Sequence, residues 1–217
     1  LDGMFAVALW DDRAKRLILA RDIPGEKPLY YSKLPAGGVV FASEIKSLAA
    51  FPGLELTLDK QAIWDLPSFL WIPEPNTIYT EVKALMPGHI MTIDEKGMET
   101  RSYQNVFEQD LSLEGLNEKE IVAEVRRIVE AAVVSRLLSD VPVGSFLSSG
   151  LDSSIIATIA SRHLKELSTF TIGFEDLADP YHGRANESHH AEAYAKVLGT
   201  KHHTIHVTGE DFLKGLD

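Results

Sequence analysis

The chain has 217 residues, of which 45% are hydrophobic and 24% charged, and its net charge at pH 7 is −11, so it reads as an ordinary globular protein of one large or two small domains. The acidic balance and the lack of a dense Lys/Arg stripe argue against a nucleic-acid partner, and the absence of cysteine excludes disulfides, thiolate catalysis and cysteine-ligated zinc within the chain. No signal peptide and no apolar stretch of about 20 residues is visible, so we expect a cytoplasmic protein without a membrane partner.

Short apolar runs separated by turns fill the first half of the chain. A tight polar turn separates residues 4–10 from residues 16–21, which predicts a hairpin. Asp59 is a candidate N-cap for a short helix. Further strands are expected near residues 29–31, 39–44 and 90–93. These patterns predict an antiparallel sheet domain, and no nucleophile–base arrangement emerges from them.

Residues 69–79, with the sequence FLWIPEPNTIY, are aromatic and rich in proline. Such a stretch can form an aromatic ligand box or a docking segment. Packing of a connecting loop against a core is the interpretation that we favour. His89, which follows in a strand–turn–strand pattern, is expected to be structural rather than catalytic.

A polar, acidic stretch at residues 104–115 lacks hydrophobic periodicity and predicts a linker. Beyond it, apolar residues recur at helical spacing, which predicts an amphipathic helix. These residues are Ile121, Val125, Ile128, Val129, Ala132 and Val133. We therefore expect a first domain at residues 1–106, a linker at 107–116 and a second domain at 117–217.

Strands and helices alternate in the second domain. Residues 141–145, 168–174 and 202–207 predict buried strands, because they are apolar, β-branched or aromatic. A helix is expected after the first strand and another at residues 187–198, with a loop at 175–184. This alternation predicts a doubly wound parallel sheet, in which ligands bind beyond the carboxyl ends of the strands.

The stretch between the first of these strands and its helix, FLSSGLDSS at residues 146–154, is rich in small hydroxylated residues. The free N–H groups of a first helical turn and the helix dipole favour an anion at such a place, and serine hydroxyls can donate to phosphate oxygens. Serine and aspartate are also preferred helix caps, so a bend without a ligand is the alternative. No Gly-x-x-x-x-Gly-Lys string is present, which disfavours γ-phosphate transfer at a Walker-type site.

The serine-rich string resembles the Ser-Gly-Gly-x-Asp-Ser pyrophosphate loop of the N-type ATP pyrophosphatases. With residues 139–144, SDVPVG, in front of it, the stretch is similar to that of glutamine-dependent asparagine synthetases. Residues 3–6, 20–22, 27–31 and 42–48 resemble the later part of the glutaminase domain of the same family. The resemblance implies a partial N-terminal-nucleophile-hydrolase-like antiparallel domain, followed by the start of a doubly wound adenine-nucleotide α-hydrolase-like domain.

The chemistry that the resemblance implies is ATP-dependent amide formation with Mg²⁺. Aspartate is activated as β-aspartyl-AMP, pyrophosphate leaves, and ammonia from glutamine gives asparagine. The family's cysteine nucleophile lies upstream of these residues, so this chain alone is expected not to hydrolyse glutamine and to be inactive or nearly so. A homodimer is the assembly that we expect.

The resemblance also assigns roles to residues of the bend and of the next strand. Leu147 and Ile172 fall where the family's backbone meets adenosine, and Asp152 falls where a carboxylate helps to hold the Mg²⁺–pyrophosphate unit. The pyrophosphate-loop positions are Ser148, Ser149, Gly150, Asp152, Ser153 and Ser154.

Ser149 departs from the family loop, which has glycine at that position. If the position needs positive φ, or backbone closer to the phosphates than a Cβ allows, Ser149 strains the loop or weakens binding. Two alternatives therefore stay open: a related amidotransferase that acts on another carboxylic acid, and a degenerate nucleotide-binding module without activity. The paired histidines, including His202 and His206, do not complete a recognisable metal-ligand spacing and are expected to be structural.

Overall fold

The computed structural model describes residues 1, 3–103, 115–174 and 188–215. The chain divides into two compact units, Leu1–Ser112 and Leu113–Asp217. Most of the linker expected at 107–116, and all of the loop expected at 175–184, lie outside the described residues.

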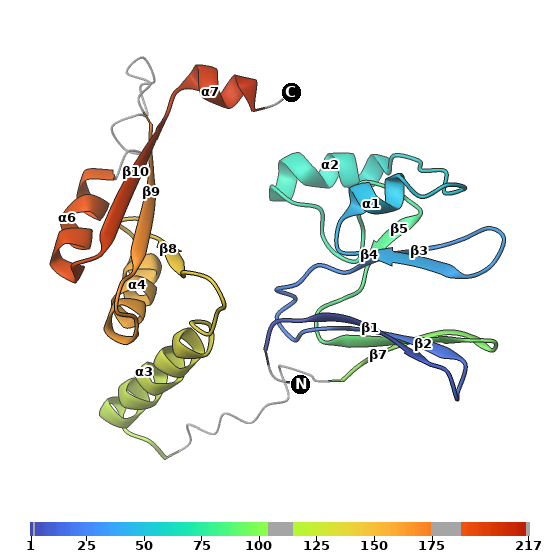
Figure 1. The fold of residues 1–217 in the computed structure, drawn as a ribbon, viewed down its shortest axis with the longest axis horizontal. Coiled ribbons are helices and arrows are strands. Elements are labelled where there is room, and N and C mark those ends of the chain that lie inside the picture. The colour runs from blue at the N-terminus through green and yellow to red at the C-terminus, as the bar shows by residue number, and fades with distance from the viewer. Residues whose placement is uncertain (2, 104–114, 175–187, 216–217) are drawn as a thin grey trace. The chain divides into compact units, whose positions relative to one another are not determined.

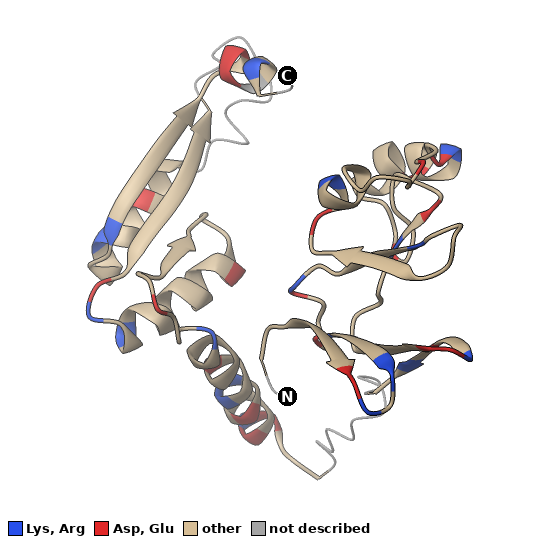
Figure 2. Ribbon diagram, turned by 45° about the vertical axis from the view of Figure 1, so that its right-hand side comes forward, with Lys and Arg blue, Asp and Glu red and all other residues tan. Residues whose placement is uncertain are grey.

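Along the described elements Lys and Arg are interspersed with Asp and Glu (Figure 2). No described helix has the length and apolar character that a membrane crossing requires.

The first unit contains two antiparallel sheets (Figure 1). The four-stranded sheet has the order β1 (Ala6–Asp11), β2 (Arg16–Arg21), β6 (His89–Asp94) and β7 (Gly97–Ser102). The three-stranded sheet has the order β4 (Val39–Ala42), β3 (Tyr30–Lys33) and β5 (Val82–Ala84). The predicted hairpin is confirmed, because Ala6 pairs with Arg21 and Asp11 with Arg16 in antiparallel register.

The core of this unit combines residues of both sheets. Leu19 of β2 and Met91 of β6 are buried with Leu29 and Leu85, and Tyr31 of β3 packs against them. Alternate residues of a strand face one side of a sheet, so this contact set places the core between the two sheets. Removal of these apolar side chains from water is the main force that holds the sheets together.

Two helices, α1 (Ile45–Ala49) and α2 (Lys60–Phe69), complete the first unit. The predicted N-cap is confirmed: Asp59 Oδ1 accepts from the N–H groups of Gln61 at 2.9 Å and Ala62 at 3.3 Å. Helix α2 is followed by its C-cap residue Leu70, which adopts the left-handed conformation with φ of 64°.

The aromatic stretch after α2 differs from the expectation of a loop packed against a core. Leu70 is 87% exposed and Trp71 is 65% exposed, while Trp64 on the helix is 73% exposed. The later residues Ile72 and Glu74 are half-buried. Only the second part of the stretch therefore packs onto the unit.

A buried charge network joins the end of β2 to distant segments. Arg21 is 5% exposed, and its Nη1 lies 3.0 and 2.9 Å from the two carboxylate oxygens of Glu74 and 2.7 Å from the Leu85 carbonyl oxygen. Its Nη2 donates to the carbonyl of Gly25, where φ is +71° and a Cβ would lie 2.7 Å from Pro87. A glycine is required there by conformation and by space.

Asp22 is fully buried and accepts three backbone hydrogen bonds. Oδ1 accepts from Glu26 N–H at 2.7 Å, and Oδ2 accepts from Phe5 and Lys27 N–H at 3.0 Å each. Burial favours the neutral carboxyl and would raise the pKa of Asp22, but the backbone N–H donors outweigh burial and hold its pKa below the ordinary value. The carboxylate therefore stabilises the turn while it is ionised.

The second unit is built on a parallel sheet of order β10 (Lys201–Val207), β9 (Ser168–Phe174) and β8 (Gly144–Phe146). Its helices are α3 (Glu118–Ser135), α4 (Leu151–His163), α6 (Ser188–Leu198) and α7 (Gly209–Lys214). The parallel pairing of β8 with β9 and of β9 with β10 agrees with the alternation of strands and helices in the sequence.

Burial differs between the two faces of this sheet. On β9, Thr169, Thr171 and Gly173 are buried, whereas the alternate residues Ile172 and Phe174 are exposed. Helices α4 and α6 pack beside each other, with the Thr158 Oγ1 and Tyr194 hydroxyls 2.7 Å apart. The helical layer and the buried Leu147, Ala157, Ala191 and Ala195 form the core of the unit.

The buried carboxylate predicts a specific loss of stability on Asp22→Asn. Both oxygens accept N–H groups, so either orientation of an asparagine would point its own N–H groups at a donor. We expect the free energy of unfolding to fall by about 2 kcal/mol, measured by urea denaturation followed by circular dichroism. Asp12→Asn, which changes an exposed carboxylate paired with Lys15, is the control and should change little.

The same carboxylate predicts a pH dependence. Its folded-state pKa is depressed, so its contribution is complete above the ordinary value of 3.8 and is lost as the pH falls through the folded-state pKa below it. The wild-type protein should lose stability in this acidic range more steeply than Asp22→Asn. Parallel curves for the two proteins would contradict the role given to Asp22.

Candidate functional site

The serine-rich bend lies where β8 ends and α4 begins, at the carboxyl end of a parallel strand. β8 ends at Phe146 and α4 begins at Leu151, so residues 147–150 form the connection. Gly144 allows β8 to approach β9, because a Cβ there would lie 2.8 Å from the ring of Phe170. The sequence therefore positions the bend through the first residue of the strand as well as through the bend itself.

Leu147 attaches the bend to the neighbouring strand. Its N–H donates to the Phe170 carbonyl oxygen at 2.8 Å, and its own carbonyl accepts from the Thr171 hydroxyl. Its side chain is buried among Ala157, Ala191 and Ala195. Both polar groups of its backbone and its side chain are thus fixed, which makes Leu147 the rigid base of the bend.

Ser148 and Ser153 hold the two sides of the bend together. Ser148 N–H donates to Ser153 Oγ at 3.1 Å, and the two hydroxyl oxygens are 2.8 Å apart. Gly150 N–H donates to Ser148 Oγ at 3.0 Å. Two amides of the bend are therefore occupied by hydroxyls of the bend itself, so an anion that uses them must displace serine side chains.

The first turn of α4 is open to a ligand. Gly150 is its N-cap, with φ of −72° and ψ of 154°, and no side chain among the described residues caps the turn. Ser154 N–H donates to the Gly150 carbonyl at 3.2 Å and begins the helical ladder. The N–H groups before it, at Leu151, Asp152 and Ser153, have no acceptor within the helix. They give the amino end of this 13-residue helix a partial positive charge, which no side chain among the described residues caps.

The predicted site residues fall in two places. Leu147 and Ser148 to Ser154 lie in one continuous bend and helical turn, whereas Ile172 lies on β9, one residue after the Thr171 that bonds Leu147. Ile172 is 50% exposed and offers an apolar surface on the strand beside the bend. Asp152 is exposed and makes no ion pair or side-chain hydrogen bond with the described residues.

Ser149 does not adopt the left-handed conformation. Among the described residues other than glycine, positive φ occurs at Lys15 and Leu70. The conformation of the bend therefore places no backbone strain on Ser149, and this part of the concern about the departure from glycine does not apply.

Thr171 was not singled out from the sequence, although it fixes the bend. The sequence does contain a sign of this role. A hydroxyl at an inward-facing position of a strand needs a hydrogen-bond partner, and the end of the neighbouring strand supplies a carbonyl group. The sequence shows the alternation of polar and apolar residues along β9, but it does not show which strand lies beside Thr171.

His202 of β10 is joined to β9 through one of its two ring nitrogens. His202 Nδ1 lies 2.9 Å from Thr169 Oγ1, and burial lowers the pKa of His202, as does His203, while Glu192 acts in the opposite direction. Within the described ranges, no three His, Asp or Glu side chains gather as a metal site would require.

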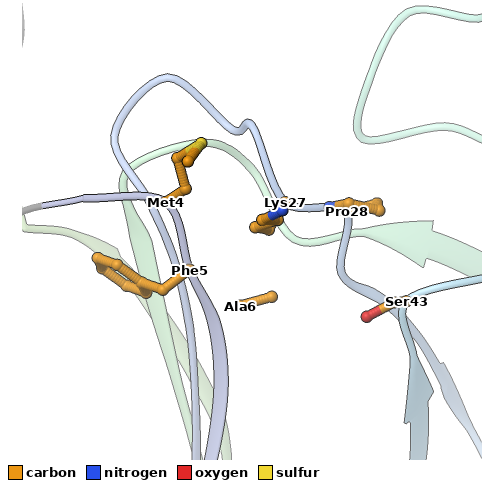
Figure 3. Close-up of a pocket in the computed structure, with 6 residues that line it drawn as sticks. All are labelled: Met4, Phe5, Ala6, Lys27, Pro28 and Ser43. Carbon is orange, nitrogen blue, oxygen red and sulfur yellow. The ribbon is translucent and has the colours of Figure 1, made fainter. Parts of the chain in front are cut away.

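The first unit has a cavity of about 420 Å³ beside the turn that Asp22 holds. Figure 3 shows its walls, which come from three segments: Met4, Phe5 and Ala6, then Lys27 and Pro28, then Ser43. Asp22 bonds the backbone of both Phe5 and Lys27 and so shapes two of these walls. The lining offers one ammonium group and one hydroxyl, without an acid–base pair among the lining residues.

Both halves of the chain match known families. Residues 1–104 match the family model of the glutamine amidotransferase domain, and residues 124–217 match that of asparagine synthase. Asparagine synthetase [glutamine-hydrolyzing] 1 of Bacillus subtilis is 36% identical over 216 residues, covering 100% of this chain and 33% of the relative. Asparagine synthetase [glutamine-hydrolyzing] 3 of Arabidopsis thaliana is 34% identical over 227 residues, covering 100% and 32%.

The chain spans about a third of the length of the curated relatives that it matches. A solved structure of glutamine phosphoribosylpyrophosphate amidotransferase from B. subtilis, complexed with ADP and GMP, is also similar. The match covers 87% of this chain and 30% of the amidotransferase chain. Its identity is 16% and its TM-score 0.23, a likeness too weak to support any statement about the fold.

The serine network predicts a local effect of Ser153→Ala. Without Ser153 Oγ, the Ser148 amide loses its acceptor, so its hydrogen exchange should become faster and the unit should lose about 1 kcal/mol of stability. Ser161→Ala is the matched control, because Ser161 bonds only the Thr158 carbonyl of its own helix. Unchanged exchange at Ser148 would show that the hydroxyl pair does not hold the bend.

Proposed function

Because the chain belongs to the glutamine-hydrolysing asparagine synthetase family, we propose that it carries part of an enzyme for ATP-dependent amide formation. The proposed reaction activates aspartate as β-aspartyl-AMP, releases pyrophosphate and uses ammonia from glutamine to give asparagine. The observation that carries the proposal is the bend at the carboxyl end of β8, which leads into a helical turn that no side chain of the described residues caps.

The bend is suited to a diphosphate leaving group. Negative charge grows on pyrophosphate as the bond between the α- and β-phosphates breaks, and oriented N–H groups stabilise that charge without reorganisation. In the proposed complex, the first-turn amides of α4 and the hydroxyls of Ser148, Ser149, Ser153 and Ser154 donate to its oxygens. The lack of a side chain at Gly150 leaves the backbone accessible.

The existing hydrogen bonds define what binding must change. Ser148 Oγ now accepts from Gly150 N–H, and Ser153 Oγ accepts from Ser148 N–H. A phosphate oxygen at these amides would take over the role of the two hydroxyls, and each hydroxyl would be free to turn and donate to another phosphate oxygen. Because the rearrangement exchanges hydrogen bonds rather than losing them, it costs little free energy.

The residues around the bend also fit the other parts of ATP. Asp152 offers a carboxylate without a competing partner among the described residues, and it would hold Mg²⁺, whose contribution is to neutralise phosphate charge. The backbone of Leu147 and the exposed side chain of Ile172 would meet adenosine. Rigid attachment of Leu147 to β9 would keep this edge in place when the nucleotide binds.

At the level of the domains, we propose that residues 1–106 are the later part of an N-terminal-nucleophile-hydrolase-like glutaminase domain. Residues 117–217 would be the first part of a doubly wound adenine-nucleotide α-hydrolase-like domain. Support comes from the antiparallel sheets of the first unit, the parallel sheet of the second and the two family matches. Assembly as a homodimer belongs to the same proposal.

Two other functions compete with this one. A related amidotransferase would use the same bend and another carboxylic acid. A degenerate nucleotide-binding module was suggested by Ser149, but the backbone there lies outside the left-handed region, so the conformational argument for degeneracy is lost.

Calorimetric titration of the chain with Mg²⁺–ATP tests the binding part. We expect binding that weakens by about tenfold in Asp152→Asn, because a charged contact is lost, and Ser161→Ala should leave it unchanged. Ser149→Gly should differ from the wild type by only about threefold, because no backbone strain is relieved. Equal binding by Asp152→Asn and Ser161→Ala would contradict the proposed site.

The reaction itself is tested on the complete reading frame that contains these residues. Pyrophosphate release from ATP should require both aspartate and ammonia. Release with another carboxylic acid instead of aspartate would favour the related amidotransferase. No release by either the wild type or Ser149→Gly would overturn the enzymatic proposal and leave a binding module.

A further inference from the structure

A cavity of about 300 Å³ runs along one face of α4 in the second unit. Its wall follows the helix from Leu151 through Ile155 and Ile159 to Arg162, with Arg126 of α3 and Tyr194 of α6 on the sides. These positions of α4 are three or four residues apart and so form a single stripe, about 16 Å long at 1.5 Å per residue. The cavity is thus bounded by three helices of the same unit.

The two arginines of this cavity have no partner among the described residues. Arg126 and Arg162 make no hydrogen bond or ion pair with any described residue. Glu130, the carboxylate of the lining, lies 3.3 Å from His163 Nε2 instead. Arg127, the next residue on α3, shows the contrast, because it pairs with Glu124 at 2.6 Å.

The rest of the lining combines an apolar wall with a hydroxyl pair. Leu151, Ile155 and Ile159 supply the apolar part, and the Thr158 and Tyr194 hydroxyls hydrogen-bond each other. In a chain with a net charge of −11, this cavity places two guanidinium groups without a described partner beside an apolar wall. Figure 2 shows basic residues both on α3 and near the end of α4.

We propose that this cavity binds a small molecule that carries an anionic head on an apolar body. The guanidinium group matches carboxylate and phosphate in planar, paired hydrogen bonds, so either head satisfies the recognition. The volume is at the lower end of ligand sites and suits one ring or a short alkyl chain. The apolar body lies along the isoleucines, while the head lies between Arg126 and Arg162.

This inference goes beyond the proposed function. Of the residues assigned to ATP, the cavity includes Ser154 and, through its side chain, Leu151, whose backbone amide is the group assigned to the diphosphate. Because Leu151 and Ser154 belong to the first turn of α4, a ligand here would also contact the turn that the proposed pyrophosphate site uses. The two sites can nevertheless fail separately, since the arginines have no role in the nucleotide proposal.

The test titrates the 217-residue chain, with isoleucine methyl groups labelled for NMR, with 4-phenylbutyrate and with phenyl phosphate. The methyl signals of Ile155 and Ile159 should shift, while that of Ile18 in the first unit should stay in place. The compound that binds more tightly identifies the preferred head, carboxylate or phosphate. The neutral analogue 4-phenylbutan-1-ol should bind much more weakly, because it cannot pair with a guanidinium.

Variants separate the cavity from nonspecific charge. Arg126→Gln and Arg162→Gln should each weaken binding by about tenfold, as expected for a charged hydrogen bond. Arg127→Gln is the matched control on the same helix and should change affinity by less than about twofold. An unchanged methyl signal of Ile205, which lies on β10 of the same unit and outside the cavity, shows that the ligand-free variants remain folded.

Three results would overturn the proposal. They are shifts that avoid Ile155 and Ile159, equal affinity for the acid and the alcohol, or equal weakening by Arg127→Gln. Tight binding of Mg²⁺–ATP alongside any of these results would leave the proposed function intact and remove only this cavity.

Discussion

The two hydrogen bonds that join Leu147 to β9 determine where the serine-rich bend lies. One uses its N–H and the Phe170 carbonyl, and the other uses its carbonyl and the Thr171 hydroxyl. With the side chain buried at the same time, the residue has no polar backbone group left to satisfy, as a buried position requires. Everything that we assign to the bend depends on this attachment, because it fixes the direction in which the first turn of α4 opens.

The bend itself is held more weakly than its base. Its hydrogen bonds are short-range and exposed, and they join serine hydroxyls to neighbouring amides and to each other. Such bonds contribute little to stability but are readily exchanged, since serine hydroxyls rotate at low cost. A rigid base with exchangeable contacts above it is a suitable arrangement for a ligand that arrives with several acceptor oxygens. In the first unit the strong contacts are buried instead: Arg21 and Asp22 have their charges satisfied by Glu74 and by backbone groups.

The sequence located the bend because strand, small residues and helix follow one another within a few positions. The sequence also predicts the β1–β2 hairpin and the Asp59 N-cap, because both depend on residues that are close together in the chain. It could not show that Arg21 meets Glu74, 53 residues further on, or that Thr171 bonds Leu147. Periodicity indicated an apolar face on α3 but not what covers it, and Val125 remains 49% exposed. The sequence also does not show that Arg126 of α3 and Arg162 of α4, which have no partner among the described residues, line one cavity.

The most direct test of the central claim is a crystal structure of the protein with a non-hydrolysable ATP analogue and Mg²⁺. We predict diphosphate density against the amides of Leu151, Asp152 and Ser153, with the hydroxyls of Ser148 and Ser153 turned from each other towards phosphate oxygens. Density elsewhere, or a bound nucleotide that leaves the Ser148–Ser153 pair intact, would contradict the account.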